Sequence, residues 1–343
     1  MNSAFIIEKS IFIVIIFAFT MVMAMYSTWA ERKVAAFLQD RVGPNRAGWG
    51  GLLQPLADGM KLFAKEEFEP NTKNKFLFFV GPAIAMSAAL MTSAVIPWGD
   101  KLIIFGRTVK LQATDTDSAL LYIFAVVSIG VYGIMIGGWA SNNKFSLMGA
   151  VRAASQMVSY EVAMGLSIIA LVMMTGTLSL KEISIQQHGW HWNFIYQPVS
   201  FLIFLICAFA ETNRTPFDLA ECESELIGGY HTEYSSMKMG FYLFAEYANM
   251  FISATIISIL FFGGYNYPGM SWAVEHWGNN IANVIGIFAL FIKLCFFIFF
   301  FMWIRWTIPR FRYDQLMNLG WKILIPLSII NIIITGICIL AFK

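Results

Sequence analysis

The chain has 343 residues, of which 58% are hydrophobic and 13% are charged, and its mean hydropathy is +0.65. This composition excludes a soluble globular protein and is typical of a polytopic membrane protein. The formal net charge of +2 excludes the strongly basic surface by which proteins bind nucleic acid.

Cofactor and metal signatures are missing from the sequence. No P-loop, dinucleotide-binding glycine fingerprint or nucleophile elbow occurs. The histidines do not cluster at metal-ligand spacing beyond His188 and His191, which lie in a loop. No C-x-x-C pair is formed by the cysteines, which are Cys207, Cys222, Cys295 and Cys338. We therefore expect this chain alone to hold no metal, no iron–sulfur cluster and no catalytic nucleophile.

Eight apolar segments are predicted to cross the bilayer as helices of about 20 residues, the fifth being short. They cover residues 4–29, 76–96, 118–140, 151–175, 195–211, 239–262, 281–304 and 321–341. The first is longer than the roughly 7–15-residue apolar region of a signal peptide and no clear cleavage site follows, so we interpret it as a retained helix. No soluble domain or low-complexity linker separates the segments. The sequence thus predicts one all-α integral membrane domain over residues 1–343.

The basic residues predict the orientation of these helices. The loops after the first, third, fifth and seventh helices hold sixteen: Arg32, Lys33, Arg41, Arg46, Lys61, Lys65, Lys73, Lys75, Lys144, Arg152, Arg214, Lys238, Arg305, Arg310, Arg312 and Lys322. The loops after the second, fourth and sixth hold four: Lys101, Arg107, Lys110 and Lys181. The positive-inside rule therefore predicts that the odd-numbered loops are cytoplasmic and that both termini lie outside.

The first cytoplasmic loop contains an amphipathic segment at residues 51–68. Its apolar positions recur at helical spacing and are Leu52, Leu56, Met60 and Phe63. The opposite face carries Gln54, Asp58, Lys61 and Lys65. This pattern predicts a helix that lies in the membrane interface rather than across it. The apolar face could contact lipid, pack on other protein, or frame a portal for a lipid-soluble molecule.

An acidic stretch at residues 211–234 lies between two apolar segments. It holds Glu211, Asp218, Glu221, Glu223, Glu225 and Glu233. A single arginine, Arg214, opposes these six carboxylates. Carboxylates that lie this close raise one another's pKa, because each resists ionising beside a charged neighbour. The stretch is therefore interpreted as a proton relay, with a solvated acidic loop as the alternative.

Some ionisable residues lie well inside the predicted spans and away from their ends, and each costs at least about 2.5–3.5 kcal/mol at the bilayer centre. Glu161 and Glu246 lie in the fourth and sixth helices, and Lys293 lies in the seventh. A polar stripe at helical spacing contains Glu246 and consists of Tyr242, Glu246, Asn249 and Ser253. Such a stripe faces protein or water, and a hydrogen-bonded seam between helices is the alternative to a relay. Lys293 needs a partner from another helix, which the sequence does not identify.

Six motifs resemble the H-subunit family of bacterial NADH–quinone oxidoreductase, respiratory complex I, whose mitochondrial counterpart is subunit 1 of NADH dehydrogenase. They are AERKV at 30–34, RVGPNR at 41–46, GLLQPLAD at 51–58, RAASQMVSYE at 152–161, ETNRTPFDLAECESEL at 211–226 and PRFRYDQLM at 309–317. The resemblance covers essentially the whole chain and every predicted cytoplasmic loop.

The resemblance implies a bacterial inner-membrane subunit that forms part of a quinone chamber and its entrance. Its partners would be peripheral quinone-module subunits and small membrane subunits. Ubiquinone or menaquinone would be the substrate, and FMN and iron–sulfur clusters would be held only by partner subunits. The family's quinone chamber maps onto Arg32, Arg41, Asp58, Arg214 and Phe217.

The same resemblance places the family's acidic relay on Glu161, Glu211, Glu221, Glu223, Glu225, Glu233 and Glu246. Some family members carry another acid in the third helix, where this chain has Ser128. A hydroxyl with a water molecule could substitute for that acid. The chain would then couple quinone reduction to proton translocation without carrying out the redox chemistry itself.

Three other functions compete with this interpretation. A related subunit of a membrane-bound hydrogenase would share the motifs without requiring quinone. A secondary transporter would contain internal repeats with broken helices at mid-membrane, and no convincing repeat is visible. A purely structural anchor would not explain why the chain places Glu161 and Glu246 inside the membrane, where ionisable side chains are energetically costly.

Overall fold

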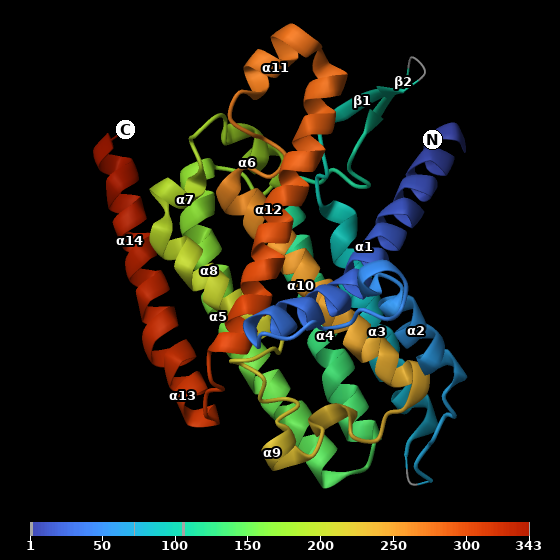
Figure 1. Ribbon diagram of the computed structural model, residues 1–343. Helices are drawn as coiled ribbons and strands as arrows, with labels where there is room; N and C mark the ends of the chain where they lie inside the picture. The colour runs from blue at the N-terminus through green and yellow to red at the C-terminus, as the bar shows by residue number, and fades with distance from the viewer. Residues whose placement is uncertain (1–2, 72, 105–106, 343) are drawn as a thin grey trace.

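The computed structural model describes the backbone of residues 3–71, 73–104 and 107–342; the side chains of residues 3–5, 104, 107, 223 and 224 lie outside the description. Its long helices form a bundle (Figure 1). We call the end of the bundle that carries the β-hairpin the hairpin end, and the end that carries the acidic stretch the acidic end.

The elements follow one another along the chain as a nearly all-helical series. The α-helices are α1 (Ser3–Leu38), α2 (Gln54–Ala64), α3 (Lys75–Thr92), α4 (Ala119–Ala140), α5 (Lys144–Thr175), α6 (Leu180–Gln186), α7 (Asn193–Tyr196), α8 (Pro198–Glu211), α9 (Glu223–Leu226), α10 (Ser236–Phe262), α11 (Met270–Trp277), α12 (Asn279–Thr307), α13 (Tyr313–Asn318) and α14 (Ile325–Phe342). Short 3₁₀ turns occupy Trp49–Gly51, Ser93–Val95 and Gly229–His231, and a π-helical segment, Leu319–Leu324, joins α13 to α14. The hairpin consists of β1 (Lys101–Ile104) and β2 (Arg107–Lys110), paired antiparallel.

Seven helices in the described ranges are long and apolar enough to cross a membrane. They are Ile6–Leu38, Lys75–Val95, Ala119–Ala140, Lys144–Thr175, Ser236–Phe262, Asn279–Thr307 and Tyr313–Phe342. Together with the shorter apolar helix α8, they confirm the predicted fold class, an all-α polytopic membrane protein. The small hairpin and α11 were not predicted, and both lie in loops at the hairpin end (Figure 1).

Helix α8 has 14 residues, about 21 Å at 1.5 Å per residue, which is shorter than the roughly 30 Å hydrocarbon core of a bilayer. It begins at Pro198, where the missing proline N–H is harmless in the first helical turn. Because α8 ends early, the residues that follow it remain inside the protein. Thr212, Asn213 and Arg214 are all buried. The start of the acidic stretch is therefore an internal segment, not a surface loop.

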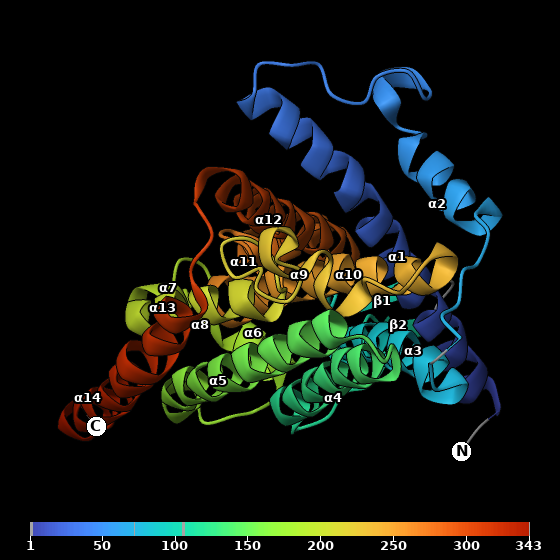
Figure 2. The same ribbon diagram turned by 90° about the horizontal axis from the view of Figure 1, so that it is seen from below.

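Helix α2 is shorter than the predicted amphipathic segment at residues 51–68. Gly51 precedes it at φ 81, and a Cβ there would lie 2.3 Å from the carbonyl oxygen of Pro44, so the chain turns at this point instead of entering a helix. Lys65 adopts an extended conformation and ends the helix. Figure 2 shows α2 set apart from the main bundle, beside α1 and α10.

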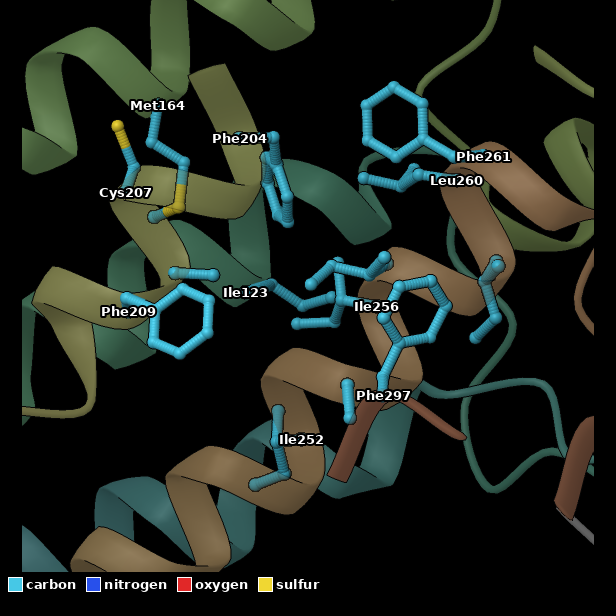
Figure 3. Close-up of a cluster of buried hydrophobic side chains, with 14 of the residues drawn as sticks. Ile123, Met164, Phe204, Cys207, Phe209, Ile252, Ile256, Leu260, Phe261 and Phe297 are labelled. Atoms are coloured by element: carbon cyan, nitrogen blue, oxygen red, sulfur yellow. The ribbon is translucent and has the colours of Figure 1, made fainter. Parts of the chain in front are cut away.

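A large apolar core fills the middle of the bundle towards the hairpin end. Side chains from α4, α5, α8, α10 and α12 converge there (Figure 3). They include Ile123, Met164, Phe204, Ile256, Leu260 and Phe297. The acidic end is built differently, with ionisable side chains between its helices, and it contains the candidate site.

Candidate functional site

A buried cluster of charges lies where the chain leaves α8. Arg214 donates to the Oε2 atom of Glu31 at 2.6 Å, and both side chains are only 7% exposed. Arg305, near the end of α12, binds the other oxygen of the same carboxylate. Glu31 therefore joins α1 to α12 and to the segment after α8. Two guanidinium groups compensate one carboxylate, and Glu246 brings a second carboxylate to the cluster.

Glu246 on α10 links this cluster to the neighbouring aromatic residues. Its Oε2 atom lies 3.6 Å from Nη2 of Arg214, and its Oε1 atom accepts a hydrogen bond from the hydroxyl of Tyr230 at 2.8 Å. The guanidinium of Arg214 also stacks 3.8 Å from the ring centroid of Tyr247. Tyr242 and Glu246 of the predicted polar stripe on α10 are buried and face protein, whereas Asn249 and Ser253 are half-buried.

A second cluster surrounds Asp218. Arg310 donates to Oδ2 of Asp218 at 2.7 Å and to Sγ of Cys222 at 3.1 Å. Burial raises the pKa of Asp218 to about 6; the Arg310 guanidinium opposes this increase and the Glu246 carboxylate adds to it. Asp218 is therefore a carboxyl group that gains and loses its proton near neutral pH, which suits proton exchange.

Glu221 is the next carboxylate of the acidic stretch. Burial raises its pKa well above the usual value, and the carboxylates of Glu246 and Asp218 raise it further. Nδ1 of His231 lies 3.4 Å from the carboxylate of Glu221. Burial is the largest cause of the raised pKa at both Asp218 and Glu221, and Glu246 of α10 adds to both; among the acids of the stretch itself, Asp218 raises the pKa of Glu221.

The other acids of this stretch lie further from the buried cluster. The Glu225 carboxylate is 54% exposed and accepts a hydrogen bond from Arg152 at 2.5 Å. Glu233 accepts a hydrogen bond from the amide of Asn143 at 2.6 Å. The side chain of Glu223 lies outside the described residues, and its backbone is the first residue of α9.

Glu161 lies within α5 and faces α4. The hydroxyl oxygen of Ser128 lies within hydrogen-bond distance of both Oε1 of Glu161 and the carbonyl oxygen of Phe124, and its single proton can be donated to either one. Ser128 therefore contacts the carboxylate directly.

Two small cavities connect the internal carboxylates. One, of about 20 Å³, is lined by Glu211 and Glu246 together with Tyr230 and Asn249. The other, of about 30 Å³, shares Glu211 and Asn249 and continues beside apolar residues towards the hairpin end. Each is large enough to hold a water molecule, which needs roughly 10–15 Å³ of such space. The geometry therefore permits a hydrated connection between Glu211 and Glu246.

A third cavity, of about 440 Å³, lies between α1, α2 and α10. Asp58 lines it and is held by Arg32 at 2.7 Å and by the amide of Gln54 at 3.0 Å. Apolar residues of α10 and the ring of Tyr247 form the opposite wall. Since Tyr247 also stacks on Arg214, one aromatic ring separates this cavity from the buried charges.

The structure brings together some of the predicted chamber residues. Arg32 and Asp58 line the large cavity, whereas Arg41 is exposed and donates to Gln39. Arg214 lies behind the cavity wall. Phe217 is buried against Tyr160 and Phe311, away from this cavity.

Sequence reasoning missed two residues of the site, Glu31 and Tyr247. The predicted first helix ended at residue 29, which left Glu31 outside it, but α1 continues to Leu38. The signal was present in the motif AERKV, whose alanine, glutamate and lysine favour a helix and which contains no glycine or proline. Tyr247 directly follows Glu246 and is not part of the helical repeat that forms the predicted polar stripe, so the sequence pattern did not identify it.

The site offers carboxylates for proton exchange and a cavity for a ligand. Among the residues that the structure describes, no group of three or more His, Cys, Asp or Glu side chains could hold a metal ion. Carboxylates can act as acids and bases, and the neighbouring arginines stabilise negative charge.

Comparison with known proteins gives consistent matches over the full length. The NADH dehydrogenase family model matches residues 11–336. A relative from Flavobacterium psychrophilum is 84% identical over 343 residues and covers 100% of both chains. A relative from Flavobacterium johnsoniae is 82% identical over 99% of this chain and 97% of its own, and one from Cytophaga hutchinsonii is 65% identical over 98% of each. All three are named as the H subunit of NADH-quinone oxidoreductase, the last with the number 1.

We predict that the Arg310→Gln substitution raises the pKa of Asp218 above its present value of about 6. The guanidinium favours the charged carboxylate, so its removal should move the pKa upward by about one pH unit or more. Infrared titration of the carboxyl C=O band, assigned with Asp218→Asn, measures this change. Arg152→Gln, which removes the partner of the exposed Glu225, should leave the band unchanged.

The same pKa fixes the sign of a pH effect on stability. Between the ordinary value of 3.8 and about 6, folded Asp218 keeps a proton that the unfolded chain has lost. The contribution of Asp218 to stability therefore falls as the pH rises through this window. If the titration midpoint of the Asp218 band in Arg310→Gln stays the same or falls to lower pH, Arg310 does not lower the pKa of Asp218.

Proposed function

The chain belongs to the NADH dehydrogenase family as a membrane subunit of NADH–quinone oxidoreductase, and we propose that it admits quinone beside α2 and converts quinone reduction into proton movement. The observation that carries this proposal is the position of Tyr247. Tyr247 lines the large cavity, and the guanidinium group of Arg214 lies 3.8 Å from the centroid of the Tyr247 ring.

The entrance we propose lies between α1, α2 and α10. The cavity there has a charged pair, Arg32 with Asp58, on one side and apolar residues of α10 on the other. A quinone has a polar head and an apolar tail, so both kinds of wall suit it. The apolar residues Leu56, Met60 and Phe63 on the opposite face of α2 are 54%, 65% and 73% exposed, which suits contact with lipid.

Charge transmission follows from the buried cluster. Electrons would reach quinone from FMN and iron–sulfur clusters if other subunits hold these cofactors, as the resemblance implies. Negative charge that develops at the quinone attracts Arg214 through the aromatic wall and weakens its attraction to Glu246. A carboxylate that loses a nearby cation binds a proton more readily, so Glu246 takes up a proton through Tyr230 or the adjoining small cavity.

The protons then move among the internal carboxylates. Glu211 shares both small cavities and stands between Glu246 and Glu161 in the proposed relay. Glu161 passes its proton to the hydroxyl of Ser128, with which it is hydrogen-bonded, and Ser128 would release its own proton to a water molecule in the same step. Ser128 would therefore take the place of the acid that some relatives carry in this helix.

The assembly and membrane placement are part of the proposal. The partners would be peripheral quinone-module subunits at the acidic end and small membrane subunits beside the helices. The multi-pass chain would lie in the bacterial inner membrane as one domain with the acidic end facing the cytoplasm, as the basic residues predict. The names of the relatives support this function over a hydrogenase subunit or a secondary transporter.

Filling the large cavity should impair access of quinone. A Cβ added to Gly59 meets no other atom within 4 Å, so Gly59→Phe should fold and obstruct the cavity that this residue lines. An obstruction that costs about 1.4 kcal/mol in quinone binding lowers kcat/KM about tenfold. The measurement is NADH oxidation by a long-tailed quinone, compared with oxidation by a hydrophilic artificial acceptor, which should not change.

Met60→Phe is the matched control, because Met60 is the next residue on α2 and its side chain is 65% exposed. It should leave both activities near those of the unsubstituted enzyme. If the Gly59→Phe enzyme assembles and retains its full rate with quinone, the proposed entrance is wrong.

Replacing Glu161 tests the relay. Glu161→Gln preserves the shape of the side chain and removes its titrating proton, so quinone-dependent NADH oxidation should fall by about tenfold or more, within the range that acid–base groups contribute. Proton movement in reconstituted vesicles should fall with it. Glu182→Gln, at an exposed acid at the hairpin end, should leave both unchanged. A Glu161→Gln complex with normal rate and normal proton movement would remove Glu161 from the relay.

A further inference from the structure

Helix α2 has little apolar contact with the rest of the protein. Of its residues, all of which the structure describes, Pro55 alone is buried, and the apolar side chains of Leu56, Met60 and Phe63 are exposed. Most helices are held in place by the packing of an apolar face. Contact of the exposed face with lipid does not fix α2 relative to α10. Polar contacts must therefore hold α2 at the large cavity.

The segment that follows α2, residues 65–70, is bound to the beginning of α10, and we call it the strap. The hydroxyl of Ser235, which directly precedes α10, accepts a hydrogen bond from the main-chain N–H of Phe68 at 2.9 Å and donates to the carbonyl oxygen of Phe68 at 3.2 Å. The hydroxyl of Ser236 donates to the carbonyl oxygen of Leu62 in α2 at 3.0 Å. Figure 2 shows the chain passing from α2 to α3 beside α10. The position of α2 therefore depends on where the strap meets α10.

Lys238, near the beginning of α10, binds two acids of the strap. Its ammonium group lies 2.5 Å from the carboxylate of Glu67 and is also bound to Glu69. Glu69 pairs in addition with Lys73, which precedes α3. The side chains of Lys238 and Lys73 are 15% and 3% exposed, whereas those of the two acids are 47% and 40% exposed. We call these four side chains the clamp.

The two lysines of the clamp rest on one aromatic ring. The ammonium groups of Lys73 and Lys238 lie 4.7 and 5.5 Å from the ring centroid of Phe78, where a cation is attracted by the ring. Phe78 is buried and stacks on Tyr234 at a centroid distance of 4.1 Å. An isolated surface ion pair contributes little to stability. Here the cations are held against the core, so the strap is bound to a fixed position.

Glu69 stays charged between the two lysines. Hydrogen bonds from Lys238 and then Lys73 are the largest causes that lower the pKa of Glu69, to about 2. Glu69 therefore remains ionised at neutral and mildly acidic pH, and its contact with Lys238 remains an ion pair.

The clamp lies at one end of the cavity proposed for quinone entry. Leu62 and Lys65 line this cavity from α2 and the strap, and Met239 and Gly240, which follow Lys238 directly, line it from α10. We propose that Lys238 is a positioning residue that holds the strap against α10 and thereby fixes α2 as a wall of the quinone entrance. A loose wall has to be ordered each time a quinone binds, which weakens binding. The effect on quinone rests on the proposed function, whereas the attachment of α2 does not.

Hydrogen–deuterium exchange of the assembled complex tests the attachment. Lys238→Met removes the charge and keeps most of the side-chain length, so the main-chain amides of α2 should exchange at least several-fold faster than in the unsubstituted complex. Lys238→Arg keeps the charge and should restore slow exchange. Amides in the middle of α10 should not change in either variant, which distinguishes release of α2 from general unfolding.

Kinetics with a long-tailed quinone test the consequence. In Lys238→Met the KM for quinone should rise several-fold with kcat nearly unchanged, because Lys238 neither lines the cavity nor belongs to the buried charge cluster. The double variant Glu67→Gln with Glu69→Gln should behave in the same way. Glu66→Gln is the matched control, because Glu66 is an exposed acid of the strap that Lys238 does not bind. It should leave both the exchange and the KM unchanged.

The outcomes separate the clamp from the entrance. Unchanged exchange of α2 in the double variant would overturn the clamp, even if Lys238→Met fails to assemble. Faster exchange with an unchanged KM would overturn the positioning role in quinone binding. If Gly59→Phe retains its full rate with quinone while α2 exchanges faster in Lys238→Met, the entrance is wrong and the attachment of α2 by Lys238 stands. If Gly59→Phe impairs quinone reduction and exchange in Lys238→Met is unchanged, the entrance stands and the clamp is wrong.

Discussion

The structure depends on one buried guanidinium. Arg214 is held between the carboxylates of Glu31 and Glu246 and stacks on Tyr247, which joins α1, α10 and the segment after α8. Removing one partner from a buried ion pair typically costs about 3–5 kcal/mol, because the remaining charge is left uncompensated. The cluster therefore holds the surrounding helices together. A change in the charge of one residue alters the electrostatic interactions of all the others in the cluster.

This arrangement explains why the acidic stretch begins inside the bundle. The short helix α8 ends before it would cross a bilayer, so Arg214 enters between helices instead of lying in solvent. Main-chain groups and charges there must be satisfied by protein, and Glu31, which Arg305 also binds, supplies part of that compensation. A cavity on one side of Tyr247 and carboxylates on the other are thereby placed within electrostatic range. Where α10 ends, the ammonium group of Lys293 donates to the main-chain carbonyl oxygens of Phe262, Gly264 and Asn266, so this helix holds a carboxylate within its length and meets a basic side chain at its end.

Hydropathy predicted the membrane helices because long apolar segments can form few other structures. The contacts inside the bundle could not be predicted, because they join residues that lie far apart in the sequence. Glu31 was missed because the first helix extends past its apolar part, where hydropathy gives no signal. The partner of Lys293 was hidden because main-chain carbonyls leave no trace in side-chain patterns. On α2 the amphipathic pattern was visible, but not that its polar face, with Asp58, lines the cavity while Leu56 is exposed. The relay roles of the acids remain predictions.

The most direct test of the central claim is the infrared difference spectrum of the assembled complex on reduction of quinone. The carboxyl C=O band that is absent from the spectrum of the Glu246→Gln variant is assigned to the Glu246 side chain. We predict that this band changes when quinone is reduced, and that the change is lost or strongly reduced in Glu31→Gln, where Arg214 is no longer anchored between two carboxylates. Oxidation of NADH by a hydrophilic acceptor should continue in that variant. An identical Glu246 band change in both enzymes would contradict coupling through the buried guanidinium.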